Sequence, residues 1–271
     1  MAQWAAFTGL LVVVLLLLLA LARNSQTALS DDDPIRFAEP SAHDPRPADP
    51  VVPRFEPPTR DPRTELTSGL LLANVVLTQG AFGAVVVVGA LALSIPLWAI
   101  GVPDTALARG LPGLAVGICF GVVLWVANEG AGALADANGA GYDETVRKLL
   151  APDSLVGWAL LLGVALPTVA VVEEVIFRGA AIGVVAAGFS VSPWLLAVVS
   201  SLVFGAAHGA QGPVGMAVTS GLGLVLAAGF VLTDSLLVVV VAHYLVNALE
   251  LVVHEGLGYE RLTIETLTSG G

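Results

Sequence analysis

The chain has little positive charge and only one cysteine. Its 271 residues include 11 Lys and Arg against 22 Asp and Glu, and Lys148 is the only lysine. Such an acidic chain lacks the basic patch that nucleic-acid binding needs, so we exclude nucleic acid as a partner. The single Cys119 excludes an intrachain disulfide and a cysteine-rich metal site, and we expect it to be a small core residue. An acidic, lysine-poor surface is also typical of proteins in a high-salt cytosol.

Apolar residues dominate the composition. Hydrophobic residues make up 56% of the chain and charged residues 12%, with a mean hydropathy of +0.87. These values indicate a multi-pass protein of the cell membrane. We predict an all-α fold, a polytopic transmembrane helical bundle of about 7–8 spans, because a span needs roughly 20 apolar residues. The expected count depends on Pro167, which we expect to kink or divide the long apolar stretch 155–188.

Composition divides the chain into four parts. Residues 1–22 predict an N-terminal transmembrane anchor, although Ala20-Leu21-Ala22 also resembles a signal-peptide cleavage site. Residues 23–65 hold nine prolines, nine acidic residues and six arginines, a composition that predicts a disordered linker. Residues 66–255 form the multi-span domain. Residues 256–271 form a polar tail.

The first polar motif in the apolar C-terminal half is Glu173-Glu174-Val-Ile-Phe-Arg178. On a helix, Glu174 and Arg178 are i,i+4 neighbours, while Glu173 turns about 100° away from them. Arg178 can thus neutralise one carboxylate and leave Glu173 to deprotonate a water molecule. A structural ion triad that locks two helices is the alternative.

Two further motifs carry imidazole and amide groups. In Phe204-Gly-Ala-Ala-His208, small residues allow water or a neighbouring helix to approach His208. In His243-Tyr-Leu-Val-Asn247, the i,i+4 spacing places two hydrogen-bond donors on one face, as an oxyanion hole requires. Each motif alone also fits interhelical hydrogen bonding in a membrane. Together they are better explained as one site, because ionisable groups are costly in hydrocarbon.

We assign no site to the remaining polar residues of this region. Asp234 is expected to cap a helix in a turn, and Glu250 with His254 is expected to be a surface pair.

The ordered series Glu-Glu-x-x-x-Arg, Phe-x-x-x-His and His-x-x-x-Asn on successive hydrophobic helices resembles the CPBP family. These are the CAAX-protease and bacteriocin-processing intramembrane proteases, also called Abi or type II CAAX prenyl endopeptidases. The resemblance covers about residues 100–255.

The resemblance implies hydrolysis of a peptide bond in a membrane-associated substrate, either a prenylated CAAX-like protein or a leader peptide. By this resemblance Glu173 activates water, His208 holds it, and His243 with Asn247 stabilises the oxyanion. Glu174 and Arg178 hold the arrangement in place. No cofactor is certain. A zinc ion bound by His208 and His243 stays open, and a glutamate-activated water without obligatory metal is favoured.

Two alternatives belong to other functional classes. The first is a non-catalytic immunity or scaffold protein of the same fold. The second is a proton-coupled transporter that uses the glutamates and histidines as a relay, which is disfavoured because no inverted repeat is visible.

Overall fold

The computed structural model describes residues 1–30, 68–103, 105, 108, 110–137 and 145–259. Helix α1 (Ala2–Ser30) continues eight residues beyond the expected end of the anchor at residue 22. The rest of the predicted linker 23–65 lies outside the described residues, as does the tail from residue 260.

The described residues form helices and contain no strand, which confirms the all-α prediction. The long helices are α1, α2 (Ser68–Ala92), α3 (Gly110–Ala137), α8 (Pro193–Ala207), α9 (Gly212–Thr233) and α10 (Leu236–Leu251). Another continuous helical stretch consists of α5 (Leu155–Leu160), η4 (Leu161–Ala165), α6 (Leu166–Glu174), η5 (Val175–Val184) and α7 (Val185–Phe189). Short elements are η2 (Leu97–Ile100), α4 (Thr145–Leu150), η6 (Gly209–Gln211) and η7 (Val252–Gly256).

Six helices of the described chain are long and apolar enough to cross a membrane, and Pro193–Ala207 is a shorter apolar helix. The predicted division at Pro167 does not occur, because Leu155–Phe189 is one helix of 35 residues. The helix stays continuous past Pro167 because its winding is π-helical at η4, just before the proline. In a π-helical turn, Pro167 cannot supply the N–H that the Leu162 carbonyl five residues earlier would accept. The Tyr244 hydroxyl donates to that carbonyl instead, at 3.1 Å.

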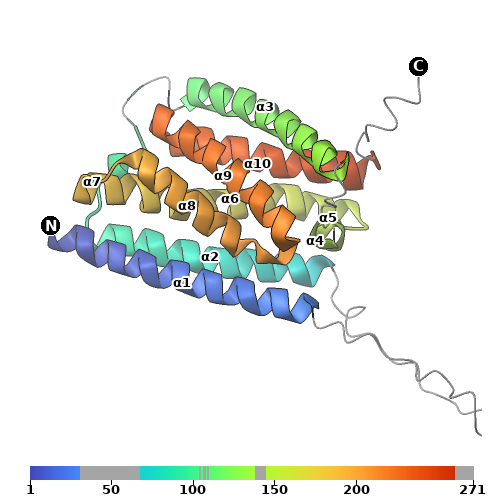
Figure 1. Cartoon of the computed structure of the whole chain (residues 1–271), viewed down its shortest axis with the longest axis horizontal. Helices are drawn as coiled ribbons and strands as arrows, with labels where there is room; N and C mark the ends of the chain where they lie inside the picture. Colours follow the sequence, from blue (N-terminus) through green and yellow to red (C-terminus); the bar gives the residue numbers. More distant parts are fainter. Residues whose placement is uncertain (31–67, 104, 106–107, 109, 138–144, 260–271) are drawn as a thin grey trace, which may run out of the picture.

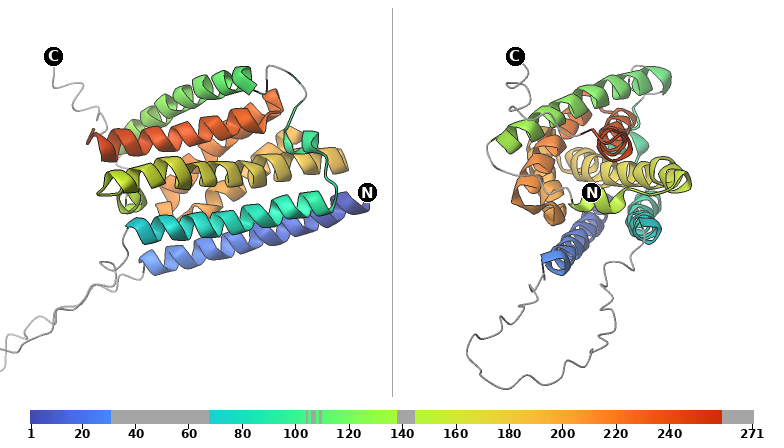
Figure 2. Two further views of the ribbon diagram at one scale, coloured as in Figure 1. Left: turned by 180° about the vertical axis from the view of Figure 1, so that it is seen from behind. Right: turned by 90° about the vertical axis from the view of Figure 1, so that its right-hand side faces the viewer.

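Helices α1, α2, α3 and α10 run roughly along one direction, and α8 and α9 cross them obliquely (Figures 1 and 2). Helices α1 and α2 lie at one edge and α3 with α10 at the opposite edge. Helix α6 lies between α2 and α10 and contacts both, and α8 packs against α9 over one face. The element that carries Glu173 and Glu174 therefore occupies the centre of the bundle.

Helices α3 and α10 approach almost backbone to backbone. A Cβ atom on Gly121 would lie 2.9 Å from the Cα of Ala242, and one on Gly117 would lie 2.9 Å from the Val238 carbonyl oxygen. Small residues are the usual means of close helix packing in lipid, where burial from water does not drive association. This contact fixes the position of α10, which carries His243 and Asn247.

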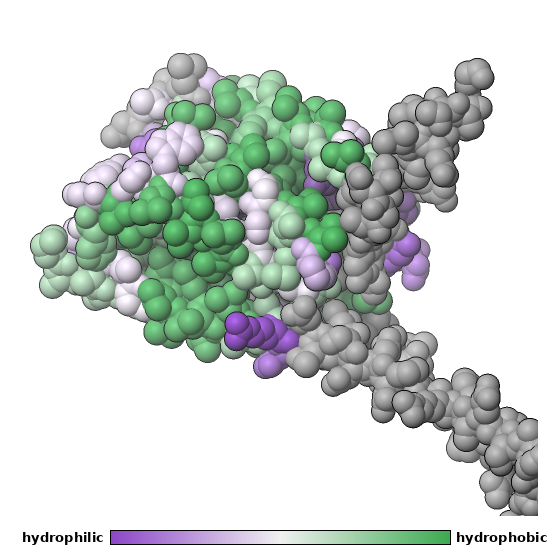
Figure 3. Space-filling model, in the orientation of Figure 1, coloured by the Kyte–Doolittle hydropathy of each residue, from purple (hydrophilic) through white to green (hydrophobic). Residues whose placement is uncertain are grey.

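Much of the outer surface is hydrophobic. Figure 3 shows hydrophobic residues over most of one face, with hydrophilic residues gathered toward one end. Exposed large side chains include Leu77, Val123 and Leu202, each more than 60% exposed. Cys119 on α3 is exposed as well, so its expected place in the core is wrong. An apolar surface of this extent, together with the long apolar helices, is that of a multi-pass membrane protein.

Candidate active site

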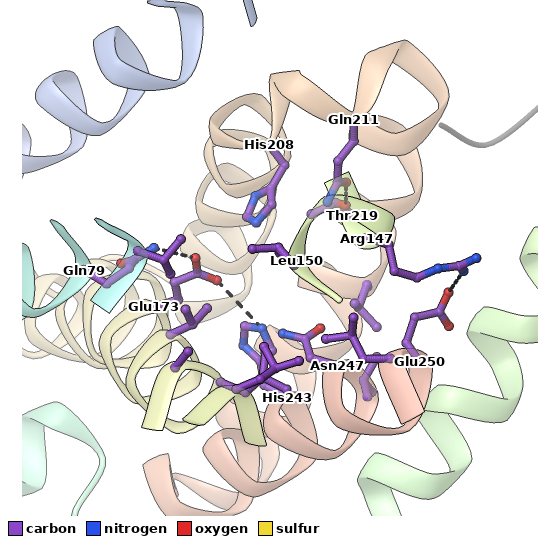
Figure 4. Close-up of a pocket in the computed structure, with 18 of the residues that line it drawn as sticks. Gln79, Arg147, Leu150, Glu173, His208, Gln211, Thr219, His243, Asn247 and Glu250 are labelled. Carbon is purple, nitrogen blue, oxygen red and sulfur yellow. Dashed lines mark hydrogen bonds and ion pairs between the residues drawn. The ribbon is translucent and has the colours of Figure 1, made fainter. Parts of the chain in front are cut away.

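A cavity of about 340 Å³ lies inside the bundle where the three polar motifs meet. Its polar lining residues are Gln79, Asn128, Arg147, Glu173, His208, Gln211, Thr219, His243, Asn247 and Glu250. Figure 4 shows Glu173, His208, His243 and Asn247 around this space. Four of the six predicted site residues therefore line one cavity. The other two, Glu174 and Arg178, do not line it.

Glu173 presents its two carboxylate oxygens differently. The side chain is near the end of α6 and only 7% of the residue is exposed. Its Oε1 accepts a hydrogen bond of 3.0 Å from Nε2 of Gln79 on α2. Its Oε2 is buried and has no hydrogen-bond partner among the described residues. One oxygen is thus anchored, and the other keeps unused capacity to accept a hydrogen bond.

Glu174 and Arg178 form a fully buried ion pair behind the cavity. Arg178 Nη1 donates to Glu174 Oε1 at 3.0 Å, as the i,i+4 spacing predicts. Arg178 Nη2 also donates to the carbonyl oxygen of Gly223 on α9, at 2.9 Å. The guanidinium lies 4.7 Å from the centre of the Phe204 ring, within cation–π distance. Arg178 consequently connects η5 with α8 and α9.

His243 lies between the two glutamates. Its Nδ1 is 2.7 Å from Glu174 Oε1, and its Nε2 is 3.8 Å from Glu173 Oε2. Because an ionised carboxylate only accepts hydrogen bonds, Nδ1 carries a proton and donates it to Glu174. The distance of 3.8 Å is too long for a hydrogen bond, so Nε2 and Oε2 are close to each other but not hydrogen-bonded.

His208 and Asn247 complete the polar wall. His208 follows the last residue of α8, and its Nδ1 lies 2.8 Å from the Phe204 carbonyl oxygen, which is an acceptor. Nδ1 therefore donates, and Nε2 is left as an acceptor that faces the cavity (Figure 4). Asn247 is half-buried and lies one helical turn after His243 in the cavity wall. Its amide adds a donor beside the imidazole.

The side chains around Glu173 do not form a three-residue zinc set as they are arranged. A shared ion requires three donor atoms close to one another. Within the described residues, only Glu129, Glu250 and His254 bring three His, Cys, Asp or Glu donors within 4.8 Å of one another. Glu173, His208 and His243 do not reach that spacing.

Sequence reasoning missed Gln79. It lies on α2, far from the three motifs, and is separated from Glu173 by 94 positions. Its only signal is that it is an amide within a largely apolar span, a feature that Asn74 shares. Gln211, to which we assigned no role, also lines the cavity, where its Oε1 accepts a hydrogen bond of 2.6 Å from Thr219.

Glu250 and His254 are not the surface pair that the sequence predicted. His254 is only 8% exposed, and its Nε2 lies 3.1 Å from Glu129 of α3 and 3.8 Å from Glu250. Arg147 of α4 reaches Glu250 at 2.8 Å. The prediction failed because α3 and α4 cover this end of α10, a tertiary contact that local spacing does not reveal. Asp234 does end a helix, as the C-cap residue of α9.

Residues 155–249 match a family model described as Rce1-like, type II CAAX prenyl endopeptidase Rce1-like. The segment contains all six predicted site residues, and it lies within the range 100–255 of the predicted resemblance. Comparison with curated proteins and with solved structures gives no match.

Proposed function

We propose that the chain is an intramembrane endopeptidase with Glu173 as general base, because residues 155–249 match the family model of Rce1-like type II CAAX prenyl endopeptidases. This proposal rests on the environment of the Glu173 carboxylate. It is buried in the wall of a cavity, anchored through Oε1, and without a partner on Oε2 among the described residues. The cavity, at about 340 Å³, is within the range of small-molecule and peptide side-chain sites.

In the proposed reaction, Oε2 of Glu173 takes a proton from a water molecule while the water oxygen attacks the scissile carbonyl carbon. A C–O bond forms, and the carbonyl π electrons move to oxygen to give a tetrahedral oxyanion. Glu173 then returns the proton to the amide nitrogen as the C–N bond breaks. The products are a carboxylic acid and an amine, and the Glu173 carboxylate is restored.

The other cavity residues stabilise and orient these species. His208 accepts the second hydrogen of the water through Nε2, since its Nδ1 is engaged with Phe204. In its imidazolium form, His243 keeps Nδ1 at Glu174 and donates from Nε2 to the oxyanion. The Asn247 amide is the second donor. Donors aimed at a developing negative charge in a site that excludes water are usually the largest catalytic contribution.

Glu174 and Arg178 act from behind the cavity. Glu174 fixes the ring of His243 through Nδ1, and Arg178 balances the buried charge of Glu174. With both glutamates ionised and Arg178 charged, an imidazolium at His243 makes the four side chains neutral in sum. A neutral set is the least costly arrangement in a low-dielectric interior.

The substrate class in this proposal is a membrane-anchored peptide or protein. The test uses purified protein in lipid vesicles and a set of membrane-anchored peptides, each with and without a prenylated cysteine. Mass spectrometry identifies the cleaved bond for wild type and for Glu173→Ala. A parallel arm contains a metal chelator.

We expect cleavage by wild type, no cleavage by Glu173→Ala, and no effect of the chelator. Equal cleavage by both proteins would refute the role of Glu173. Loss of cleavage with the chelator would refute the metal-free mechanism. The difference between prenylated and unprenylated peptides assigns the substrate class.

A further inference from the structure

The contact between α2 and α6 brings a residue from outside the matched segment to the Glu173 carboxylate. Gln79 is half-buried on α2 and lines the cavity, and the matched segment begins only at residue 155. Its Nε2 donates to Glu173 Oε1 at 3.0 Å. No other side chain of the described residues donates a hydrogen bond within standard distance to the Glu173 carboxylate.

The chemistry of the partner fixes the orientation of the Gln79 amide. A carboxylate accepts hydrogen bonds and donates none, so the amide nitrogen must face it. The opposite orientation would place two oxygens against each other. The Gln79 oxygen is turned elsewhere, and it is buried without a hydrogen-bond partner in the described part of the chain. The protein therefore leaves one buried acceptor unsatisfied while it keeps the bond to Glu173, although such groups are costly.

Close packing holds α2 in place for this bond. Gly83 lies one turn after Gln79, and a Cβ atom there would be 2.6 Å from Cγ2 of Val172. Val172 immediately precedes Glu173 and is itself buried. Because Gly83 has no side chain, α2 can approach α6 closely at the level of the two glutamates.

We propose that Gln79 is a positioning residue for Glu173, an inference that rests on the proposed function. The terminal torsion of a glutamate is broad and nearly two-fold, so an unanchored carboxylate would exchange its two oxygens and vary its angle. Gln79 holds Oε1 and thereby presents Oε2 to the water between Glu173 and His243. Misplacement of a catalytic group by about 1 Å can cost about 100-fold in rate.

The test compares Gln79→Met with wild type in the vesicle cleavage assay. Met has a similar length and no amide, so it removes the hydrogen bond with little change in volume. We expect kcat to fall about 10- to 100-fold while KM stays within about twofold. Asn74→Leu is the matched control, because Asn74 is an exposed amide on the same helix outside the cavity. It should leave kcat and KM unchanged.

A second variant tests the same contact without changing Gln79. Gly83→Ala pushes α2 away from Val172, so it should lengthen the bond to Glu173 and lower kcat in the same way. Thermal unfolding in detergent controls for folding of every variant. A wild-type kcat in Gln79→Met, or an equal change in kcat and KM, would overturn the positioning role.

These results are distinguishable from failure of the proposed function. If wild type cleaves no peptide, the protease proposal fails first. If wild type cleaves, Glu173→Ala does not, and Gln79→Met keeps the wild-type kcat, only the positioning role fails. If Gln79→Met does not fold, the kcat of Gly83→Ala decides.

Discussion

Nδ1 of His243 lies 2.7 Å from Oε1 of Glu174, a carboxylate with no exposed surface. The two residues are 69 positions apart and come from α10 and α6. The same oxygen also accepts from Arg178. Glu174 therefore faces away from the cavity and orients the imidazole, while its neighbour Glu173 lines the cavity. Adjacent glutamates on one helix thus occupy different environments.

Replacement of the two glutamates should separate stability from activity. Glu174→Ala leaves Arg178 charged and fully buried with only the Gly223 carbonyl as a hydrogen-bond partner, and should lower the free energy of unfolding by about 3–5 kcal/mol. Glu173→Ala removes no ion pair within hydrogen-bonding distance, so it should abolish cleavage with a much smaller loss of stability. Chemical unfolding in detergent measures the free energy of unfolding of both variants, and the vesicle assay measures their cleavage. Equal unfolding midpoints for the two variants would contradict the assignment.

Asn247 should behave as an oxyanion donor. Asn247→Ala removes the donor and should lower kcat about 100- to 1,000-fold with little change in KM, the usual effect of losing one such donor. Asn247→Asp keeps the shape but places a negative charge beside the oxyanion, so its kcat should be lower still. Steady-state kinetics on one cleaved peptide tests whether kcat falls in the order wild type, Asn247→Ala, Asn247→Asp. A higher kcat for Asp than for Ala would argue against the role.

Local spacing explains why part of the site was predictable. Glu174 and Arg178 form the expected i,i+4 pair, and His243 and Asn247 line one cavity from one helical face. The long apolar stretches likewise predicted an all-α membrane bundle, because only length and composition decide that class. These features depend on a single helix each, so they are visible in a linear sequence.

Features that depend on contacts between helices were missed or predicted wrongly. The bond from Gln79 to Glu173 needs α2 beside α6, and no local pattern specifies that pairing. Cys119 was expected in the core but is exposed, because a helix that is apolar all round does not distinguish lipid from protein neighbours. His254 is buried only because α3 supplies Glu129.

The turn between α9 and α10 should make stability depend on pH. Partial desolvation raises the pKa of Asp234, an exposed residue, above its ordinary value of 3.8. A raised pKa in the folded protein means that Asp234 contributes stability below its unfolded pKa, and this contribution is lost as pH rises through the folded pKa. Asp234→Asn removes this titration and tolerates the left-handed backbone, φ 51°. Unfolding midpoints of wild type and variant should therefore converge at acidic pH, with the variant more stable at neutral pH. A difference between the two unfolding midpoints that grows as the pH falls would contradict this prediction.

Arg147 should hold α4 against the end of the bundle. Its Nη1 lies 2.8 Å from Glu250 and its Nε 2.7 Å from Glu255, with all three side chains at most 16% exposed. A six-residue helix is too short to be stable by itself, so these ion pairs should keep α4 in place. Arg147→Met should lower the free energy of unfolding by about 1–3 kcal/mol. It should also speed hydrogen exchange at residues 145–150.

Leu149→Ala provides the control for this prediction, because Leu149 is an exposed residue of the same helix. Exposed substitutions away from specific contacts usually change stability by no more than about 0.5 kcal/mol. Since Arg147 and Leu150 both line the cavity, release of α4 should also raise KM for a membrane-anchored peptide more than it lowers kcat. Unchanged exchange in Arg147→Met would show that α4 is held by contacts other than the Arg147 ion pairs.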